Sequence, residues 1–198
     1  ALSEMLDYNT TSSTIKGNST TEGTLDYWYY TNIQYAGYSD YIEDTVWCND
    51  RSIYSGNGYS PDKYSHYNAF YRQKYNTTTY SCPNPANDLF TIKGNAKGNG
   101  ALTYPIGLIS IDELIYSGLV HGHINKMAFT SISQNYWTMS PMYHINSGQS
   151  HLWYYDSSGV IANFVVSKPS GIRPVINLKG DTEISGGIGT ANDPFIVK

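Results

Sequence analysis

Polar and aromatic side chains concentrate between Tyr136 and Ile176, and these residue types could recognise a ligand. Only three residues of this stretch are charged, and a packed core does not need the histidines and amides that it holds in one run. Tyr offers rigid amphipathic contact area, while Ser, Gly and Asn offer adaptable hydrogen bonds. The stretch therefore predicts a recognition face, and the alternative is strands that use aromatic residues for packing alone.

Titratable residues elsewhere form no pattern that predicts catalysis. Glu43-Asp44 and Asp112-Glu113 are adjacent carboxylates rather than a facing pair, and the second pair suits the positive N-terminus of a helix. His121 and His123 lack a third ligand at a telling spacing, which favours a polar loop over a metal site. The nucleophile-elbow and phosphate-loop motifs are absent from the sequence. We expect no enzymatic activity and no cofactor.

The two cysteines, Cys48 and Cys82, flank a region that is rich in Gly, Asn and Tyr and poor in aliphatic residues. Neither lies near a second Cys or a His at zinc-binding spacing. We predict one disulfide, with a reduced pair as the alternative, and closing this loop would contribute about 3 to 4 kcal/mol. We assign no metal site, although Asp50, Asp62 and Asp88 stay open as ligands of a structural calcium ion, which needs about six to eight oxygens.

The composition of the 198 residues excludes two classes of partner. Charged residues make up 14% and aromatic residues 15%, with 20 Tyr and a net charge of -4. Without a dense run of Lys and Arg, nucleic acid is not an expected partner. No apolar run reaches the roughly 18 residues of a membrane span, and Ala1 does not open the basic-then-apolar layout of a signal peptide. We expect a trimmed ectodomain or a mature chain that does not insert into a membrane.

The N-terminal half predicts few regular elements. Residues 1–24 are mostly Ser, Thr, Asn and Gly and predict an exposed lead-in, whereas residues 25–198 predict a single domain. Between residues 26 and 99, short apolar segments alternate with turn residues, which predicts short strands and long loops held by the disulfide.

One helix is expected between Ser110 and Leu119. Ser110 and Glu113 have the spacing of a capping box, and apolar residues recur on one face. Gly118 or Gly122 suits the end of this helix. A short strand within residues 102–109 should lead into it.

The C-terminal third predicts antiparallel β-hairpins. The expected strands are residues 135–139, 152–155, 160–166 and 171–178, with a last one at 194–197. The turn residues Asp156 to Gly159 separate two of them. The class expected from these patterns is α+β with β-structure dominant.

The C-terminal motifs resemble those of a known family. Tyr136-Trp137-Thr138-Met139-Ser140-Pro141, Asp156-Ser157-Ser158-Gly159 and the segment from Gly171-Ile172-Arg173-Pro174-Val175 to Leu178 resemble the YW-x-x-SP … GxRPV-x-x-L pattern of bacterial surface proteins. Those proteins belong to the formylglycine-generating-enzyme-like branch of the C-type lectin fold, which includes variable proteins diversified by retroelements. The resemblance covers about residues 45 to 198. It implies a C-type lectin-like fold rich in β-hairpins, with one or two short helices and long irregular loops.

The resemblance also implies roles for individual residues between 136 and 176. In such relatives the Trp-containing strand and the Arg-Pro strand are framework, and the side chains between them project from one sheet face. The implied framework positions are Tyr136, Trp137, Ser140, Pro141, Gly159, Gly171, Arg173 and Pro174. The implied ligand-binding positions are Met142, Tyr143, His144, Asn146, Gln149, His151, Trp153, Tyr155, Phe164 and Ser167. Packing favours a core role for Trp137 and Trp153, and Arg173 is expected to be a buried hydrogen-bonding anchor.

These patterns predict an extracellular or cell-surface binding module, receptor-like or adhesin-like, on a bacterium or a phage virion. Its partner would be a protein or glycan ligand on another cell or surface. A structural surface or pilus-like subunit is the alternative, because a Tyr-rich face can also pack on a neighbouring subunit. A degenerate enzyme of the formylglycine-generating kind is a weaker alternative, because that chemistry uses a cysteine pair near the C-terminal part and no Cys follows Cys82.

Overall fold

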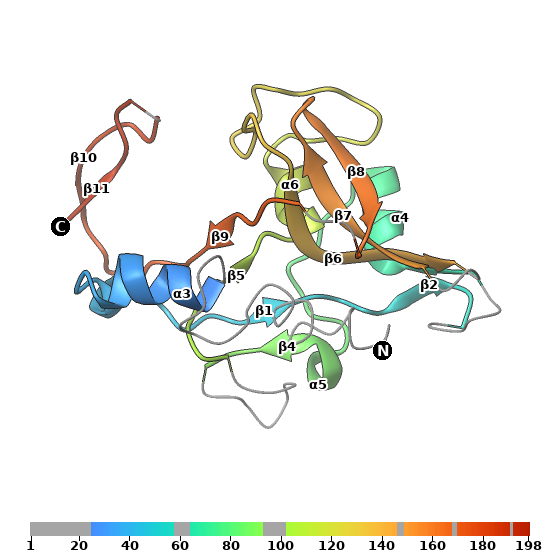
Figure 1. The fold of residues 1–198 in the computed structure, drawn as a ribbon, viewed down its shortest axis with the longest axis horizontal. Helices are drawn as coiled ribbons and strands as arrows, with labels where there is room; N and C mark the ends of the chain where they lie inside the picture. The colour runs from blue at the N-terminus through green and yellow to red at the C-terminus, as the bar shows by residue number, and fades with distance from the viewer. Residues whose placement is uncertain (1–24, 58–63, 93–101, 146–148, 168–169, 191) are drawn as a thin grey trace.

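A five-stranded antiparallel sheet organises the chain in the computed structural model, which describes residues 25–57, 64–92, 102–145, 149–167, 170–190 and 192–198. The strand order is β2-β3-β6-β7-β8 (Figure 1). The strands span β2 (Ile53–Ser55), β3 (Ser65–Tyr67), β6 (Tyr136–Ile145), β7 (Gln149–Asp156) and β8 (Val160–Val165). Strands from two distant parts of the sequence therefore share one sheet.

The C-terminal hairpin of this sheet forms where the sequence predicts it. β7 and β8 pair in a regular register from His151↔Val165 to Asp156↔Val160. The turn between them is closed by a hydrogen bond from the backbone N–H of Gly159 to the carbonyl of Asp156, at 2.8 Å. Gly159 has a φ of +95°, a backbone conformation that favours glycine. The predicted α+β class with dominant antiparallel strands is confirmed.

The predicted helix is also confirmed, as α6 (Ile111–Tyr116). The Ser110 hydroxyl accepts a hydrogen bond from the Glu113 backbone N–H at 3.2 Å, and the Glu113 carboxylate accepts one from the Ser110 N–H at 2.7 Å. This reciprocal pair is the capping box. Beyond the helix, Gly118 adopts a φ of +100° and ends it as expected.

Short strands form between residues 26 and 99 as expected, but two helical segments lie there that the sequence did not predict. One is α3 (Leu25–Tyr29), which continues as the π-helix η1 (Tyr30–Gln34), and the other is α4 (Asn68–Tyr75). The buried residues of α4 are Ala69, Arg72 and Gln73. Because two of these three are polar, the inward face of α4 gives no apolar periodicity, which is why the sequence did not predict it.

The remaining elements are short, and they form three further two-stranded sheets. They are η2 (Ser39–Tyr41), β1 (Trp47–Cys48), α5 (Pro85–Asp88), β4 (Leu89–Phe90), β5 (Gly107–Leu108), β9 (Pro174–Val175), β10 (Ile184–Gly186) and β11 (Ile196–Val197). β1 pairs with β4, β5 with β9, and β10 with β11. The strands expected over residues 102–109 and 171–178 thus shrink to two residues each, whereas the expected last strand is present as β11.

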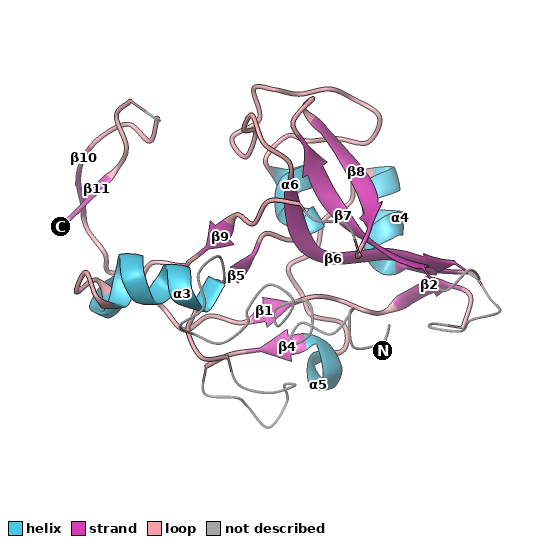
Figure 2. Ribbon diagram, in the orientation of Figure 1, coloured by secondary structure: helices cyan, strands magenta, loops and turns pink. Residues whose placement is uncertain are grey.

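Two apolar clusters cover opposite faces of the five-stranded sheet, because alternate residues of β7 point to opposite sides. Leu152 belongs to the cluster that includes Leu25, Trp47 and Phe90. Trp153 belongs to the other cluster, which α6 supplies with Ile111 and further apolar residues. The helices α4 and α6 therefore cover one face of the sheet (Figure 2).

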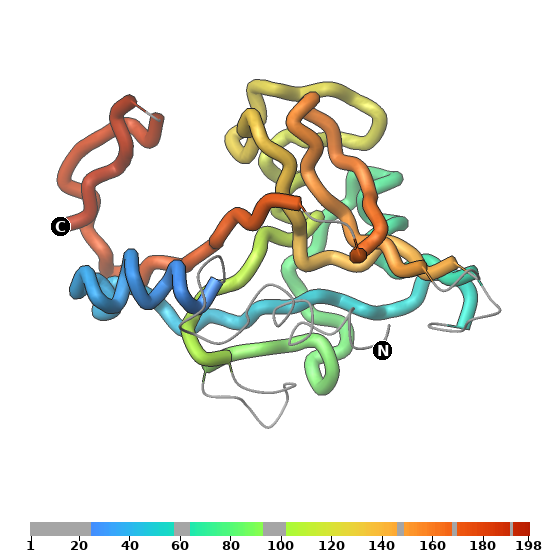
Figure 3. The backbone as a smooth tube through the Cα atoms, in the orientation of Figure 1, coloured from blue at the N-terminus to red at the C-terminus, as the bar shows by residue number. Residues whose placement is uncertain are grey.

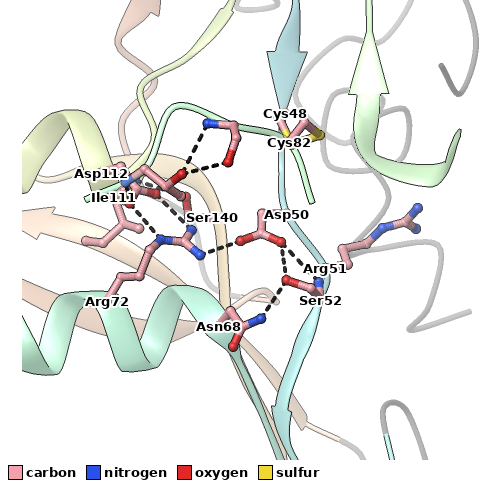
Figure 4. Close-up of polar contacts among 12 residues, drawn as sticks. Cys48, Asp50, Arg51, Ser52, Asn68, Arg72, Cys82, Ile111, Asp112 and Ser140 are labelled. Atoms are coloured by element: carbon pink, nitrogen blue, oxygen red, sulfur yellow. Dashed lines mark hydrogen bonds and ion pairs between the residues drawn. A yellow bond between two sulfur atoms is a disulfide. The ribbon is translucent and has the colours of Figure 1, made fainter. Parts of the chain in front are cut away.

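A buried ion network around Arg72 fixes α4 against α6 and against the segment between β1 and β2 (Figure 4). The Arg72 guanidinium donates from Nε and Nη2 to the two carboxylate oxygens of Asp112, at 2.7 and 2.9 Å, and from Nη1 to Asp50 at 2.5 Å. Burial alone would lower the pKa of Arg72, but the hydrogen bonds and charges of Asp112 and Asp50 raise it overall. The backbone N–H of Thr79 also donates to Asp112.

A covalent bond lies next to this network. Cys48 and Cys82 form the predicted disulfide, with their Cα atoms 5.7 Å apart. Arg51 also links the segment after β1 to the residue before β4, because its Nε donates to the buried carboxylate of Asp88 at 2.6 Å. The short strands β1 and β4 are therefore held by side-chain bonds as well as by their own brief pairing.

Replacing Arg72 tests how much of the fold depends on the ion network. We expect Arg72→Met to lower the free energy of unfolding by about 3 to 5 kcal/mol, because two buried carboxylates lose their shared partner. Urea unfolding at pH 7 measures the change. The matched control is Lys74→Met, at an exposed position of the same helix, which should stay within about 0.5 kcal/mol of the wild type. Equal losses in the two variants would contradict the role assigned to Arg72.

Candidate ligand-binding surface

The ten positions that the resemblance assigns to ligand binding do not share one exposed face. Tyr143 and His151 are half-buried. Three positions are exposed, namely Gln149, Phe164 and Ser167, and four are buried, namely Met142, His144, Trp153 and Tyr155. Asn146 lies outside the described residues. The expectation that Met142, His144, Trp153 and Tyr155 lie at the surface is therefore wrong.

The helices explain this burial. Met142, Trp153 and Tyr155 point towards α4 and α6 and belong to the apolar cluster beneath them. His144 is fully buried, and its Nδ1 lies 3.1 Å from the Ser150 hydroxyl on β7. Phe164 lies on the other side of the sheet, because it pairs with Leu152. A sheet face that the sequence alone makes look exposed is thus covered by helix α4, which the sequence did not predict.

The residues for which packing favours a core or anchoring role behave as expected. Trp137 and Trp153 are buried, at 7% and 4% exposure, so their expected core role is confirmed. Arg173 is a partly buried anchor: its Nη1 donates to the carbonyl of Thr130, and its guanidinium lies 5.3 Å from the centre of the Tyr136 ring. The two ends of the predicted binding segment therefore serve the fold.

An exposed set of aromatic rings begins at the two half-buried positions, Tyr143 and His151. Their rings stack at 4.4 Å between centroids, and Tyr64 stacks on Tyr143 at 5.3 Å. His66 on β3 packs edge-on against Tyr64 and contacts Phe70 of α4 at 4.2 Å. These rings run from β7 across β6 and β3 to the helix.

A second group of rings continues along the outer side of α4. Tyr71 lies 4.6 Å from Tyr75 and 4.9 Å from Tyr54 of β2, measured between ring centroids. The ammonium of Lys74 lies within 6.0 Å of the Phe70 ring and 5.5 Å of the Tyr75 ring, and so joins the two groups. We call the whole set the aromatic strip; it consists of Tyr54, Tyr64, His66, Phe70, Tyr71, Tyr75, Tyr143 and His151.

Exposure distinguishes the aromatic strip from ordinary core packing. Tyr54, Tyr64 and Tyr75 are 48%, 49% and 52% exposed, and each nevertheless touches another ring of the strip. Large aromatic side chains that keep this much accessible area in one place are typical of binding surfaces.

The two histidines of the strip favour the neutral state. Burial lowers the pKa of His66, and the charge of Lys74 lowers it further. Burial also lowers the pKa of His151, against a smaller opposite effect of its hydrogen bond to Asn163. The His151 Nδ1 lies 3.0 Å from the Asn163 side-chain oxygen, so Nδ1 carries the proton and Nε2 is left as an acceptor. At neutral pH, Lys74 is therefore the cation that lies against these rings.

Most of the strip was missed in the sequence analysis. Six of its eight rings come from residues 54–75, where Tyr, His and Phe are denser than in the stretch from Tyr136 to Ile176. That density was a usable signal. The sequence did not predict that these rings lie next to Tyr143 and His151, because their proximity depends on the antiparallel pairing of β3 with β6, where His66 faces Tyr143.

A hollow lies beside the disulfide and has a volume of about 420 Å³. Its lining includes Asp50, Arg72 and Asp112, whose charges are already engaged with one another. Asp50 and Asp88, two of the three open calcium ligands, each pair with an arginine, and Asp62 lies outside the described residues. Within the described part of the chain, no three His, Cys, Asp or Glu side chains gather as metal ligands would. The charged residues that line this hollow thus have a structural role.

Comparisons with protein-family models, with curated proteins and with solved structures find no match. Among the helices in the described parts of the chain, none has the length and apolar character that crossing a membrane requires.

The neutral histidines give the fold a pH dependence of defined sign. Because burial lowers the pKa of His151 in the folded state, its stabilising contribution is complete above the ordinary histidine pKa of about 6.5 and is lost as pH falls towards the folded value. Between pH 7.5 and pH 5, the wild type should therefore lose more unfolding free energy than His151→Gln does. Urea unfolding at both pH values measures this difference, with the exposed His123→Gln as control. Parallel losses in wild type and His151→Gln would refute it.

Proposed function

We propose that this chain is a non-catalytic extracellular binding module and that it contacts its ligand through the aromatic strip. The observation that supports this proposal most strongly is the set of accessible Tyr rings that pack on one another across β2, β3, α4 and β6. Rings held by their neighbours lose little conformational entropy on binding, so they act as anchors. The ligand is a protein or glycan of another cell or surface.

The proposal includes a C-type lectin-like fold. It is supported by the dominant antiparallel hairpins, the short helices and the irregular connections between them. It is also supported by the contacts of the motif residues: Trp137 and Tyr136 are buried, and the Gly171 N–H donates to the carbonyl of Asn135 at the start of the Trp-containing strand. These contacts suit a framework role for both ends of the resemblance.

The state of the cysteines favours a binding module over an enzyme of the formylglycine-generating kind. That chemistry requires a pair of reactive cysteines, and both cysteines of this chain are joined to each other. A disulfide persists in oxidising surroundings, which suits an extracellular or cell-surface location on a bacterium or a phage virion. Asp50 and Asp112, which line the hollow beside the disulfide, are engaged with Arg72, which suits a structural role for them.

Diversification of the ligand contacts is part of the proposal, at fewer positions than the resemblance alone implies. The buried members of the predicted set support the core, and Tyr143 and His151 belong to the strip. Gln149 is exposed and pairs with Ile145 at the ends of β7 and β6. Sibling chains from the same genome should therefore differ at Tyr143, Gln149 and His151 and keep Trp153 and Tyr155. Sequencing them measures this, and invariant residues at the three accessible positions would contradict diversification.

Substitution of the exposed rings tests the binding surface. We first identify a ligand with an array of immobilised glycans and proteins, and then measure its affinity for variants. Tyr64→Ala and Tyr75→Ala should each weaken binding by at least about 30-fold, because central aromatic anchors contribute about 2 kcal/mol or more. Their melting temperatures should stay close to the wild type, since exposed substitutions cost little.

The controls for this experiment are Tyr35→Ala and Tyr116→Ala, at positions that are 82% and 75% exposed and lie outside the strip. Both should bind the array ligand like the wild type. If a control loses as much affinity as Tyr64→Ala, the strip is not the contact surface. A chain that binds nothing on the array would contradict the proposed function itself.

A further inference from the structure

The last segment of the chain forms a hairpin that extends away from the rest of the protein (Figure 3). β10 and β11 pair with each other, and the turn between them is closed by backbone hydrogen bonds from Gly189 and Thr190 to the carbonyl of Asp193. The large apolar side chains of this hairpin are exposed by between 39% and 73%; they are Ile184, Ile188, Phe195, Ile196 and Val197. None of them belongs to either apolar cluster of the protein.

Such a hairpin is incomplete as a folding unit. Two strands alone are at best marginally stable in water, and a third strand or an apolar partner is needed to stabilise them. A fully buried Ile or Phe side chain contributes about 1.5 to 3 kcal/mol, and this hairpin leaves several half-exposed. The exposed apolar face and the open strand edges therefore both require a partner.

The five-stranded sheet also has an open strand edge, at β8. β8 pairs with β7 on one side, and no described strand pairs with its other side. Because Val166 donates its N–H to Ser150 of β7, the alternation of an antiparallel ladder turns the backbone groups of Val165, Asn163 and Ile161 outwards. Proteins usually protect such an edge with Lys, Pro or a bulge. β8 contains neither residue, and its register is regular.

The surface next to this edge is apolar. Phe164 is 39% exposed, and its ring lies 5.6 Å from Tyr154 and 6.3 Å from Trp137, between centroids. The residues of β8, β10 and β11 include no charged side chain, so neither side would repel the other. β8 is an uncharged strand with an open edge, and β10 and β11 are uncharged strands of a hairpin without a core, so the two are complementary in backbone hydrogen bonding and in apolar surface.

We propose that the C-terminal hairpin of one copy of this chain adds to the β8 edge of a second copy. The incoming strand would continue the sheet, as in other cases of strand addition, and Phe195 and Ile196 would cover Phe164. Donor and acceptor are different surfaces of the same molecule, so the contact is heterologous and each copy keeps one free donor and one free acceptor. The chain then assembles head to tail rather than as a closed pair. This self-association is independent of the proposed ligand binding.

Two variants that each lack one half of the contact provide the test. Phe195→Asp places a charge on the donor hairpin. Val165→Pro removes an outward N–H from the acceptor edge, at a position where edge strands tolerate proline. In sedimentation velocity over a wide concentration range, the wild type should form species larger than a dimer. Each variant alone should associate at least about 30-fold more weakly.

Mixing the two variants distinguishes the proposed contact from a symmetric one. Phe195→Asp retains the acceptor and Val165→Pro retains the donor, so an equimolar mixture should form a dimer with twice the mass of the chain and nothing larger. A symmetric hairpin-to-hairpin contact would leave Val165→Pro assembled like the wild type, and this result would overturn the proposal. A wild type that stays monomeric at every concentration would overturn it as well.

Alternative substitutions are available if a variant does not fold properly. Ile188→Asp replaces Phe195→Asp, and Val165→Lys replaces Val165→Pro, if either shows a lowered melting temperature. The matched control is Met127→Asp, which places the same charge at a side chain that is 92% exposed and lies outside both surfaces. It should assemble like the wild type. Equal dissociation in Met127→Asp would mean that charge alone controls assembly and would overturn the proposal.

Discussion

The buried guanidinium of Arg72 determines the positions of three segments from different parts of the chain. It holds α4, the N-terminus of α6 and the segment after β1 through two carboxylates, Asp112 and Asp50. A charged group in this place is costly unless every partner is present, so the position of each of the three segments depends on the other two. The sheet face beneath α4 and α6 is then closed, and the aromatic strip runs from β7 across β6 and β3 onto the outer side of α4. The aromatic strip thus depends on an interaction that does not touch it.

Local signals predicted the elements that depend on neighbouring residues. The capping box of α6 and the turn that ends at Gly159 each arise from a few neighbouring residues whose chemistry allows little else. α4 gave no such signal, because its inward face carries Arg72 and Gln73, and these polar residues are buried by partners far away in sequence. Apolar periodicity does not predict a helix whose buried face is polar.

The sequence predicted only part of the candidate site, for a related reason. Tyr143 and His151 lie in the segment that the motifs delimit, but most of their neighbours belong to β3 and α4, which join them only through strand pairing across a long sequence separation. The wrong assignments have one cause. Residues of β6 and β7 alternate between two faces: α4 and α6 cover one, and the apolar cluster that includes Leu25 and Trp47 covers the other. Motif spacing alone does not tell how much of either face remains accessible.

The alternation in β6 and β7 also limits how this protein can evolve. Consecutive codons from Met142 to Tyr155 specify buried and accessible side chains in close succession, so a mutational process that acts on every codon of the segment would alter the core as often as the surface. Most random recombinants would fail to fold before selection for binding could act on them. Tyr54, Tyr64 and Tyr75 are largely accessible, but the codons near Tyr64 and Tyr75 also specify buried side chains such as Tyr67 and Arg72. The evolutionary freedom of the surface therefore lies in single accessible positions rather than in a continuous segment.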